Sequence, residues 1–251
     1  MSKLERDFYT YLKNFADGQN IRLPANDFNV RDITVTNVLT VNDEAIFADV
    51  HFLFGYDDGS EMFTTNLGYR FSYRNDEEVG KDLVYLAGNS YLFREFHISE
   101  DKEIDNCLLH AFVPTDGHEL ISLFAWAMDT EDLGLFRKCC SDDIFIRRAG
   151  VNGDHYELKG IADALSFIRK DKEYYRDNMY SLVIEKEGEG EILAYHLYPA
   201  NTGNKHLGSN TRYAQFFNED ITFTISNHKI CKVVFRRKER PIVKRQQLIV
   251  L

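Results

Sequence analysis

The sequence has few cysteines and prolines and no long apolar run. Of its 251 residues, 4 are proline and 4 are cysteine. No apolar stretch approaches the roughly 18 residues that a membrane-spanning helix needs. The first residues, MSKLERDFYTYLKNF, also lack the apolar core of a secretory signal peptide. From these absences we expect a cytoplasmic protein that does not associate with a membrane.

The cysteines do not have the spacing of metal ligands. Cys107, Cys139, Cys140 and Cys231 form no CxxC or Cys/His motif, so we expect reduced, half-buried thiols and no metal. Cys139 and Cys140 are adjacent on a predicted helix, where neighbouring side chains point in different directions. The chain also has no phosphate-binding loop, dinucleotide fingerprint, nucleophile elbow or HExxH motif, and we therefore expect no cofactor.

Positive charge is scarce except near the end of the sequence. The formal net charge is -10, which would repel nucleic acid over most of the surface. Only KVVFRRKERPIVKR, residues 232–245, concentrates basic side chains, and a basic edge strand that resists aggregation explains this segment. We expect no nucleic-acid partner.

Apolar and aromatic residues are abundant instead. They make up 44% and 14% of the chain, enough apolar surface to offset the entropy of ordering it. The length suits two domains of common size. We therefore expect a globular, two-domain protein.

A helix with an apolar surface on most sides is predicted from His118. Ile121, Phe124, Ala125 and Met128 share one face, and a second flank consists of Leu120, Leu123, Trp126 and Ala127. Such a helix must be covered on more than one side. A second helix is predicted to be capped by Asp129 or Thr130 and to bury Leu133, Phe136 and Cys140.

The remainder of the second half alternates between strands and one more helix. A strand at Ile144–Ile146 and a hairpin are followed by a helix predicted after Gly160, with Ile161, Ala164, Leu165 and Ile168 on one face. Later residues alternate with period two: Ile192, Ala194, His196 and Tyr198 share one strand face, and Leu193, Tyr195 and Leu197 the other. Further strands are predicted at 213–217, 221–225 and 230–235. Helices preceding an antiparallel sheet predict an α+β fold with the helices on one face.

Four segments of the second half, within residues 114–240, stand out together: AMDTED, SDD before a strand, YELKG before a helix and the closing NHKICKVVF. Their order and spacing resemble the nuclear transport factor 2-like superfamily, which includes ketosteroid isomerases and polyketide-cyclase-like proteins. The resemblance implies a cone-shaped fold, in which a strongly bent antiparallel sheet wraps helices around an apolar pocket.

The first half suggests a degenerate copy of the same fold. ITVTNVLTVNDEAIFADVHFLF parallels YSLVIEKEGEGEILAYHLYP, and both halves order their strands similarly. The hypothesis is therefore a tandem protein, with a degenerate nuclear transport factor 2-like domain at 1–112 and a full one at 113–251. Antiparallel strands of similar composition also align by chance, which is the alternative.

The resemblance to ketosteroid isomerases implies a test of their chemistry. Those enzymes use a tyrosine of the first helix as oxyanion donor and an aspartate after the first strand as base. The matching positions here are Phe124 and Arg148. Phenylalanine donates no hydrogen bond and arginine is no base near neutral pH, so this isomerase chemistry is disfavoured.

His196 and Tyr198 are the candidates for acid–base chemistry, because they share one strand face with apolar residues. Tyr213 and Gln215 could face them from a neighbouring strand. The candidate ligand-binding residues are Phe124, Met128, Tyr195, His196, Tyr198, Tyr213, Gln215 and Phe217. The alternative for His196 is a core histidine hydrogen-bonded to a backbone carbonyl.

Asp49 and His51 form a second polar pair. They share a strand face with Phe47 and Leu53, while the opposite face is apolar: Ile46, Ala48, Val50, Phe52 and Phe54. If their face is covered, Asp49 could orient the His51 imidazole. The alternative is an exposed cross-strand pair.

Together these patterns predict a protein that binds an apolar or aromatic small molecule in a cone-shaped pocket, with weak acid–base chemistry as an addition. One alternative is a protein-interaction or oligomerisation module that forms a homodimer. Another is an isomerase, cyclase or dehydratase, although no complete catalytic constellation is visible.

Overall fold

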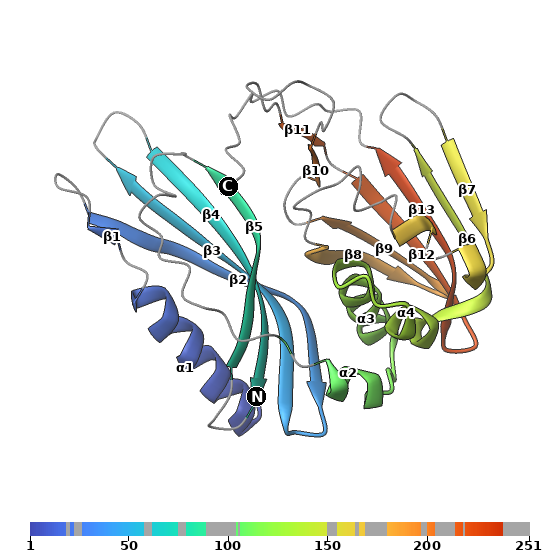
Figure 1. Cartoon of the computed structure of the whole chain (residues 1–251), viewed down its shortest axis with the longest axis horizontal. Helices are drawn as coiled ribbons and strands as arrows, with labels where there is room; N and C mark the ends of the chain where they lie inside the picture. The colour runs from blue at the N-terminus through green and yellow to red at the C-terminus, as the bar shows by residue number, and fades with distance from the viewer. Residues whose placement is uncertain are drawn as a thin grey trace. The chain divides into compact units, whose positions relative to one another are not determined.

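The computed structural model describes residues 1–18, 21–22, 27–57, 62–74, 79–88, 104, 106–149, 155–163, 166–168, 180–196, 200–203, 214–217 and 219–237. These residues fall into two compact units, one within Met1–Leu108 and one within Leu109–Arg245. Each unit has its own helices and sheet (Figure 1). Among the described residues, no helix is both long and apolar enough to cross a membrane.

The first unit is one helix on an antiparallel meander. Helix α1 (Lys3–Gly18) precedes the strands β1 (Ile21–Arg22), β2 (Asp27–Val41), β3 (Ala45–Asp57), β4 (Met62–Arg74) and β5 (Val79–Gly88). The strands follow one another across the sheet in chain order. In the three-residue connection between β2 and β3, Asn42 and Asp43 both have positive φ angles, of 51° and 55°, as the centre of a type I′ turn requires, and the Glu44 amide donates to the Val41 carbonyl oxygen at 2.9 Å.

Helix α1 is held by its cap and its apolar stripe. The Ser2 hydroxyl accepts a hydrogen bond from the Glu5 amide at 3.1 Å, while the Glu5 carboxylate accepts one from the Ser2 amide, which is a capping box. The buried stripe of the helix packs on one face of β3 and β4 through Leu4, Phe8, Leu12, Ala16, Ile46, Ala48, Val50, Phe52, Tyr69, Phe71 and Tyr73. The prediction that this face of β3 is core is confirmed for Ile46, Ala48, Val50 and Phe52, whereas the side chain of Phe54 lies outside the described residues.

Helix α2 (Cys107–Ala111) spans the boundary between the units, and the second unit continues with α3 (Gly117–Asp129) and α4 (Leu133–Cys139). From Leu120 to Asp129, every α3 residue except Ser122 is buried, which confirms the prediction of a helix covered on most sides. The predicted cap of the next helix was wrong. Asp132 caps α4 through its carboxylate, which accepts from the Leu135 amide at 3.0 Å, whereas Thr130 ends α3.

The main sheet of the second unit has the order β7-β6-β13-β12-β9-β8. Its strands are β6 (Cys140–Ala149), β7 (His155–Lys159), β8 (Leu182–Gly188), β9 (Glu191–His196), β12 (Glu219–Ser226) and β13 (Lys229–Arg237). A separate pair consists of β10 (Ala200–Gly203) and β11 (Ala214–Phe217). The α+β class with curved sheets is as predicted (Figure 1). One detail differs, because β6 and β13 are parallel neighbours.

The third predicted helix lies only partly within the described residues. A single 3-10 turn, η1 (Ile161–Asp163), follows Gly160, and residues 166–168 are helical with Phe167 and Ile168 buried. Gly160 has a φ angle of +86°, which favours glycine. Ala164 and Leu165 lie outside the described residues.

Candidate functional site

A buried ion pair lies at the centre of the second unit. The Arg148 guanidinium donates from Nε to Glu219 Oε1 at 3.3 Å and from Nη2 to Glu219 Oε2 at 2.5 Å. The side chains are 0% and 2% exposed. This two-pronged geometry is the strongest that arginine and a carboxylate form, and it fixes both groups.

Strand periodicity places these charges on the inner face. Arg148 follows the buried Ile144 and Ile146 at intervals of two along β6, and Glu219 precedes Ile221 and Phe223 at the same interval along β12. Strand β13 lies between β6 and β12. The guanidinium therefore reaches across β13, with its Cζ 4.4 Å from the centre of the Phe235 ring.

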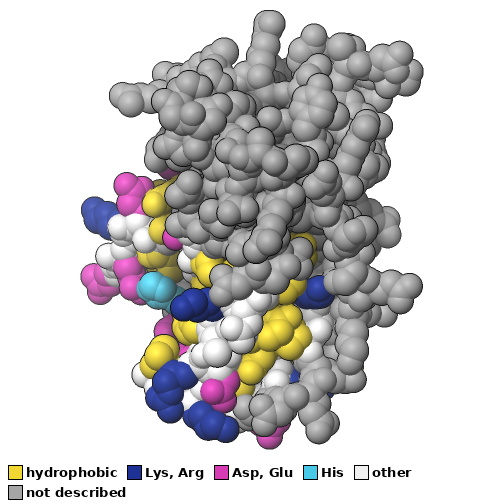
Figure 2. Space-filling model, turned by 90° about the vertical axis from the view of Figure 1, so that its left-hand side faces the viewer, with side chains coloured by type: hydrophobic (Ala, Val, Ile, Leu, Met, Phe, Trp, Pro, Cys, Tyr) yellow, Lys and Arg dark blue, Asp and Glu magenta, His cyan; other side chains and the backbone are white. Residues whose placement is uncertain are grey.

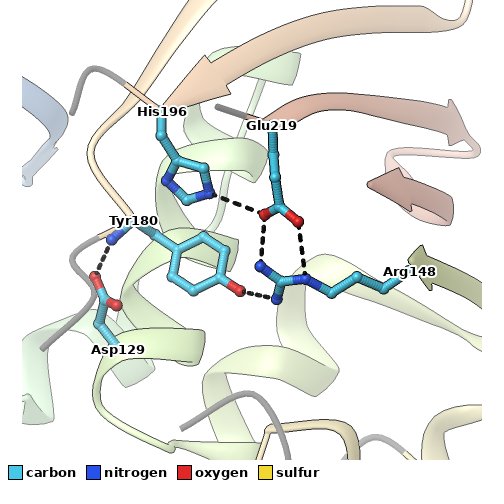
Figure 3. A network of polar contacts seen from close by, with 5 residues as sticks. All are labelled: Asp129, Arg148, Tyr180, His196 and Glu219. Carbon is cyan, nitrogen blue, oxygen red and sulfur yellow. Dashed lines mark hydrogen bonds and ion pairs between the residues drawn. The ribbon is translucent and has the colours of Figure 1, made fainter. Parts of the chain in front are cut away.

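Tyr180 and Asp129 extend the ion pair into a network (Figure 3). Arg148 Nη1 donates to the Tyr180 hydroxyl at 2.9 Å. The Tyr180 amide donates to Asp129 Oδ2 at 3.0 Å, which ties the residue to the end of α3. All three residues are buried, so this chain of contacts links helix, sheet and the segment before β8 through the interior.

His196 completes the network at the end of β9. The ladder pairs Asp220 with Tyr195, so the next residues, Glu219 and His196, lie side by side. His196 Nε2 is 3.8 Å from Glu219 Oε2, and the imidazole ring is 5.0 Å from the Tyr180 ring. His196 is 4% exposed. The His196 imidazole therefore lies beside a carboxylate and a phenol ring in the interior.

Aromatic rings surround this polar network. The Phe124 ring of α3 lies 6.4 Å from Tyr180 and 5.3 Å from Phe223 of β12. Phe235 lies 5.9 Å from Phe167. Charged groups in such surroundings lose their hydration, so each depends on the partners described above.

Several predicted site residues lie at or near the network. His196 is a member, and Phe124 contacts Tyr180. Met128 is buried in α3, whereas Tyr195 lies on the opposite face of β9 and is half-buried. Two further predicted residues, Gln215 and Phe217, are described only as backbone positions of β11, and Tyr198 and Tyr213 lie outside the described residues.

The sequence analysis does not include two members of the network and assigns two others a different role. Asp129 was interpreted as a helix cap, Glu219 and Tyr180 were not considered, and Arg148 was considered only as a residue that cannot be a base. The signal was present for the ion pair, because period two puts both charges on apolar strand faces. Tyr180 had no such signal, since it precedes β8.

The first unit has a polar cluster of its own. Arg70 Nε donates to Asp49 Oδ1 at 3.2 Å, and Asn37 Nδ2 donates to Asp49 Oδ2 at 2.6 Å. Asp49 and His51 are 0% and 1% exposed, so the alternative of an exposed pair is wrong. Asp49 and Arg70 are directly opposite in the ladder of β3 and β4.

No group of three or more potential metal-ligating side chains occurs in the part of the chain that the structure describes. Charges of both signs are interspersed with apolar side chains over the described part of the face in Figure 2. That part of the face therefore has no continuous patch of one charge.

Comparisons with known proteins bear only on the fold. No protein-family model and no curated protein matches the sequence. Solved structures do match, among them three described as "putative polyketide cyclase". The protein from Sinorhizobium meliloti is 15% identical, with a TM-score of 0.32 and coverage of 47% of this chain and 94% of its own. The Pseudomonas putida protein is 17% identical, with a TM-score of 0.38 and coverage of 51% and 95%.

The third match, from Xanthomonas campestris, is 16% identical, with a TM-score of 0.35, and covers 46% of this chain and 85% of its own. A further match, whose title includes the abbreviation NTF2, is 14% identical with a TM-score of 0.31. All four identities are below 25% and all four TM-scores are below 0.5, so the relationship to the nuclear transport factor 2-like superfamily stays a prediction.

Proposed function

We propose that the second unit binds a small aromatic molecule between α3 and its sheet, with the network of Arg148, Glu219, Tyr180 and His196 at the polar end of the site. The observation that supports this most is the convergence of these four side chains inside an aromatic interior. Small-molecule sites typically combine an apolar lining with a few well-placed polar groups.

The cost of burying these groups supports a role beyond folding. Replacing a buried ion pair by apolar side chains of similar volume is often neutral or stabilising. We therefore expect the sheet to be about as stable with apolar side chains at both positions. Their retention beside an imidazole and a phenol is explained if the network recognises a polar group of a ligand.

Each side chain would have a distinct role. Glu219 holds the Arg148 guanidinium in place through two contacts, and Arg148 in turn orients the Tyr180 hydroxyl. Tyr180 and His196 are the groups that can exchange hydrogen bonds or a proton with a ligand oxygen. Tyr198, the predicted partner of His196, stays a candidate. Isomerase, cyclase or dehydratase chemistry would require a substrate bound next to Tyr180 and His196.

Binding requires local opening, because the four side chains are at most 4% exposed. We therefore expect slow association, with a rate that does not increase in proportion to ligand concentration at high concentrations. The alternative of an interaction module gains no support from α3. This helix suggested an exposed apolar surface, but it is buried from Leu120 to Asp129 except at Ser122.

The first test is native mass spectrometry of the purified protein, compared with the denatured sample. A retained small molecule that is released on unfolding would support the proposal. Where none is retained, titration with 2-naphthol, followed by Trp126 fluorescence, tests the site directly, because this single tryptophan of the chain lies in α3.

The matched variants are Tyr180→Phe and Lys232→Gln. Tyr180→Phe removes one hydroxyl of the network, while Lys232 is exposed on β13. We expect Tyr180→Phe to weaken 2-naphthol binding roughly tenfold, the equivalent of one hydrogen bond, and Lys232→Gln to leave it unchanged. Equal binding by both variants and the natural chain would contradict the proposed site.

A further inference from the structure

Two thiols of the second unit lie in contact at the junction of α4 and β6. Cys139 Sγ and Cys140 Sγ are 3.7 Å apart, and both side chains are buried. The prediction that these adjacent side chains point in different directions assumed that both are helical. Instead, Cys139 is the last residue of α4, and Cys140 starts β6 with φ −105° and ψ 152°. The change of backbone conformation between them brings the sulfurs together.

We propose that Cys139 and Cys140 form a modification site, at which an oxidant such as hydrogen peroxide converts the two thiols into a reversible disulfide between adjacent residues. One thiolate attacks the peroxide, giving a sulfenic acid and releasing water after protonation. The second sulfur then displaces hydroxide from the sulfenic sulfur and loses its proton, which yields a second water. Two thiols are oxidised and one peroxide is reduced.

The geometry indicates that this disulfide would be easily reduced. Adjacent Cα atoms are about 3.8 Å apart across a trans peptide. Ordinary disulfides join Cα atoms roughly 4.4–6.8 Å apart, and strained ones have more oxidising potentials. A disulfide at this position therefore resembles a switch more than a structural cross-link.

The surroundings set the rate of the reaction. Burial raises the pKa of the Cys140 thiol well above its usual range, contact with Cys139 adds to this, and the nearby Lys229 ammonium opposes it. Lys229 Nζ donates hydrogen bonds to the carbonyl oxygens of Arg137 and Lys138, next to the thiols. We therefore expect the two thiols to react slowly with peroxide while the last turn of α4 is folded, and faster when that turn unwinds and exposes them to solvent.

Disulfide formation would be transmitted to the aromatic interior. The Cys139 thiol and the Cys140 amide both donate to the Phe136 carbonyl oxygen. The Phe136 ring lies 5.6 Å from Phe124, which in turn contacts Tyr180. Formation of the S–S bond removes the hydrogen bond from the Cys139 thiol to the Phe136 carbonyl oxygen. We expect this loss to shift Phe136 and thereby the packing of Phe124 against Tyr180.

The test is peptide mapping after oxidation of the folded protein with hydrogen peroxide. Remaining thiols are blocked with N-ethylmaleimide, and trypsin then releases CCSDDIFIR, residues 139–147, which contains neither of the other cysteines. We expect this peptide to lose two hydrogens and take up no maleimide. Dithiothreitol treatment before blocking should restore two maleimide adducts. Exposed Cys107 is the internal control for oxidant access.

Two variants make the result decisive. Cys107→Ser/Cys231→Ser should still form the disulfide, because it removes only the alternative partners. Cys139→Ser should not form it, and its circular dichroism shows whether it folds. The proposal is overturned if peptide 139–147 still takes up two maleimides when Cys107 is fully oxidised, or if its cysteines are found linked only to Cys107 or Cys231.

Discussion

Both units bury an arginine–carboxylate pair in their sheet, but the pairs are built differently. In the first unit, Asp49 and Arg70 face each other on the neighbouring strands β3 and β4, and Arg70 Nε lies 3.2 Å from Asp49 Oδ1. In the second unit, Arg148 and Glu219 lie on strands separated by β13 and meet through two contacts.

The difference distinguishes a local contact from a network. Residues directly opposite on two strands meet as soon as the strands pair, and the Asp49 carboxylate is completed by Asn37 of the next strand. Arg148 and Glu219 meet only when β6, β13 and β12 are all assembled, and they then engage Tyr180 and His196. The second pair therefore connects distant elements, and it is the better candidate for a site.

The largest expected effect comes from breaking the second pair on one side. Arg148→Met leaves Glu219 as a buried charge without its main partner, and we expect a loss of about 3–5 kcal/mol in the free energy of unfolding. Urea denaturation followed by Trp126 fluorescence measures it, because Trp126 belongs to the second unit.

The double variant Arg148→Met/Glu219→Leu is the control. Removing both charges should recover most of the loss. The interpretation of Arg148 and Glu219 as a buried, coupled pair is wrong if Arg148→Met lowers the free energy of unfolding by less than about 1 kcal/mol, the loss expected for an exposed ion pair. The same interpretation is also wrong if the double variant is less stable than Arg148→Met.

A matched pair of amide substitutions gives the next largest effect. Each amide keeps one accepting oxygen. In Glu219→Gln the new NH2 faces the Arg148 guanidinium, which has no acceptor, so one charge-assisted contact is lost. In Asp49→Asn the oxygen can keep the contact with Arg70, and the NH2 can donate to the Asn37 amide oxygen once that amide turns. At about 1.5–3 kcal/mol for each bond to a charged group, Glu219→Gln should be the more destabilising variant. Thermal unfolding of each variant, followed by circular dichroism, measures the two losses. Equal losses, or a larger loss for Asp49→Asn, would contradict the distinction between the two pairs.

The parts of the fold that depend on periodicity were predictable from the sequence. The apolar helix at Leu120–Asp129, the hairpin of β8 and β9 and the inner position of His196 all follow from spacing. Spacing does not reveal which strands become neighbours. The parallel contact of β6 with β13 depends on the path of the whole chain and was missed for that reason.

The candidate site was predictable only in part, for the same reason. Period two places Arg148 and Glu219 on inner faces, yet their meeting depends on the strand order. Tyr180 enters the network because β8 pairs with β9 so that Leu182 lies opposite His196, which brings the preceding residues toward the imidazole. A single hydrophobicity pattern has no information on such contacts between distant segments.

Tyr180→Phe should have an intermediate effect. It removes the hydroxyl that accepts from Arg148 but preserves the ring contacts with Phe124 and His196. We expect a loss of about 1–3 kcal/mol, because one guanidinium N–H is left without its partner. Trp126 fluorescence during urea denaturation measures it. In Arg148→Met, where the partner is already absent, Tyr180→Phe should cost clearly less, and additive losses would show that the two residues are not coupled.

The smallest effect is expected at Asn37 of the first unit. The ladder of β2 and β3 is irregular between Thr36 and Leu39, and Asn37 adopts a positive φ angle of 50° there while its amide binds Asp49. Asn37→Gly loses the hydrogen bond but tolerates the backbone, so we expect about 0.5–1.5 kcal/mol of destabilisation. Asn37→Ala loses the same bond and also has an unfavourable backbone, which adds about 1 kcal/mol. Circular dichroism during urea denaturation measures both. Equal stability of the two variants would mean that the backbone at this bulge relaxes freely, and that Asp49 is held by Arg70 without help from the shape of β2.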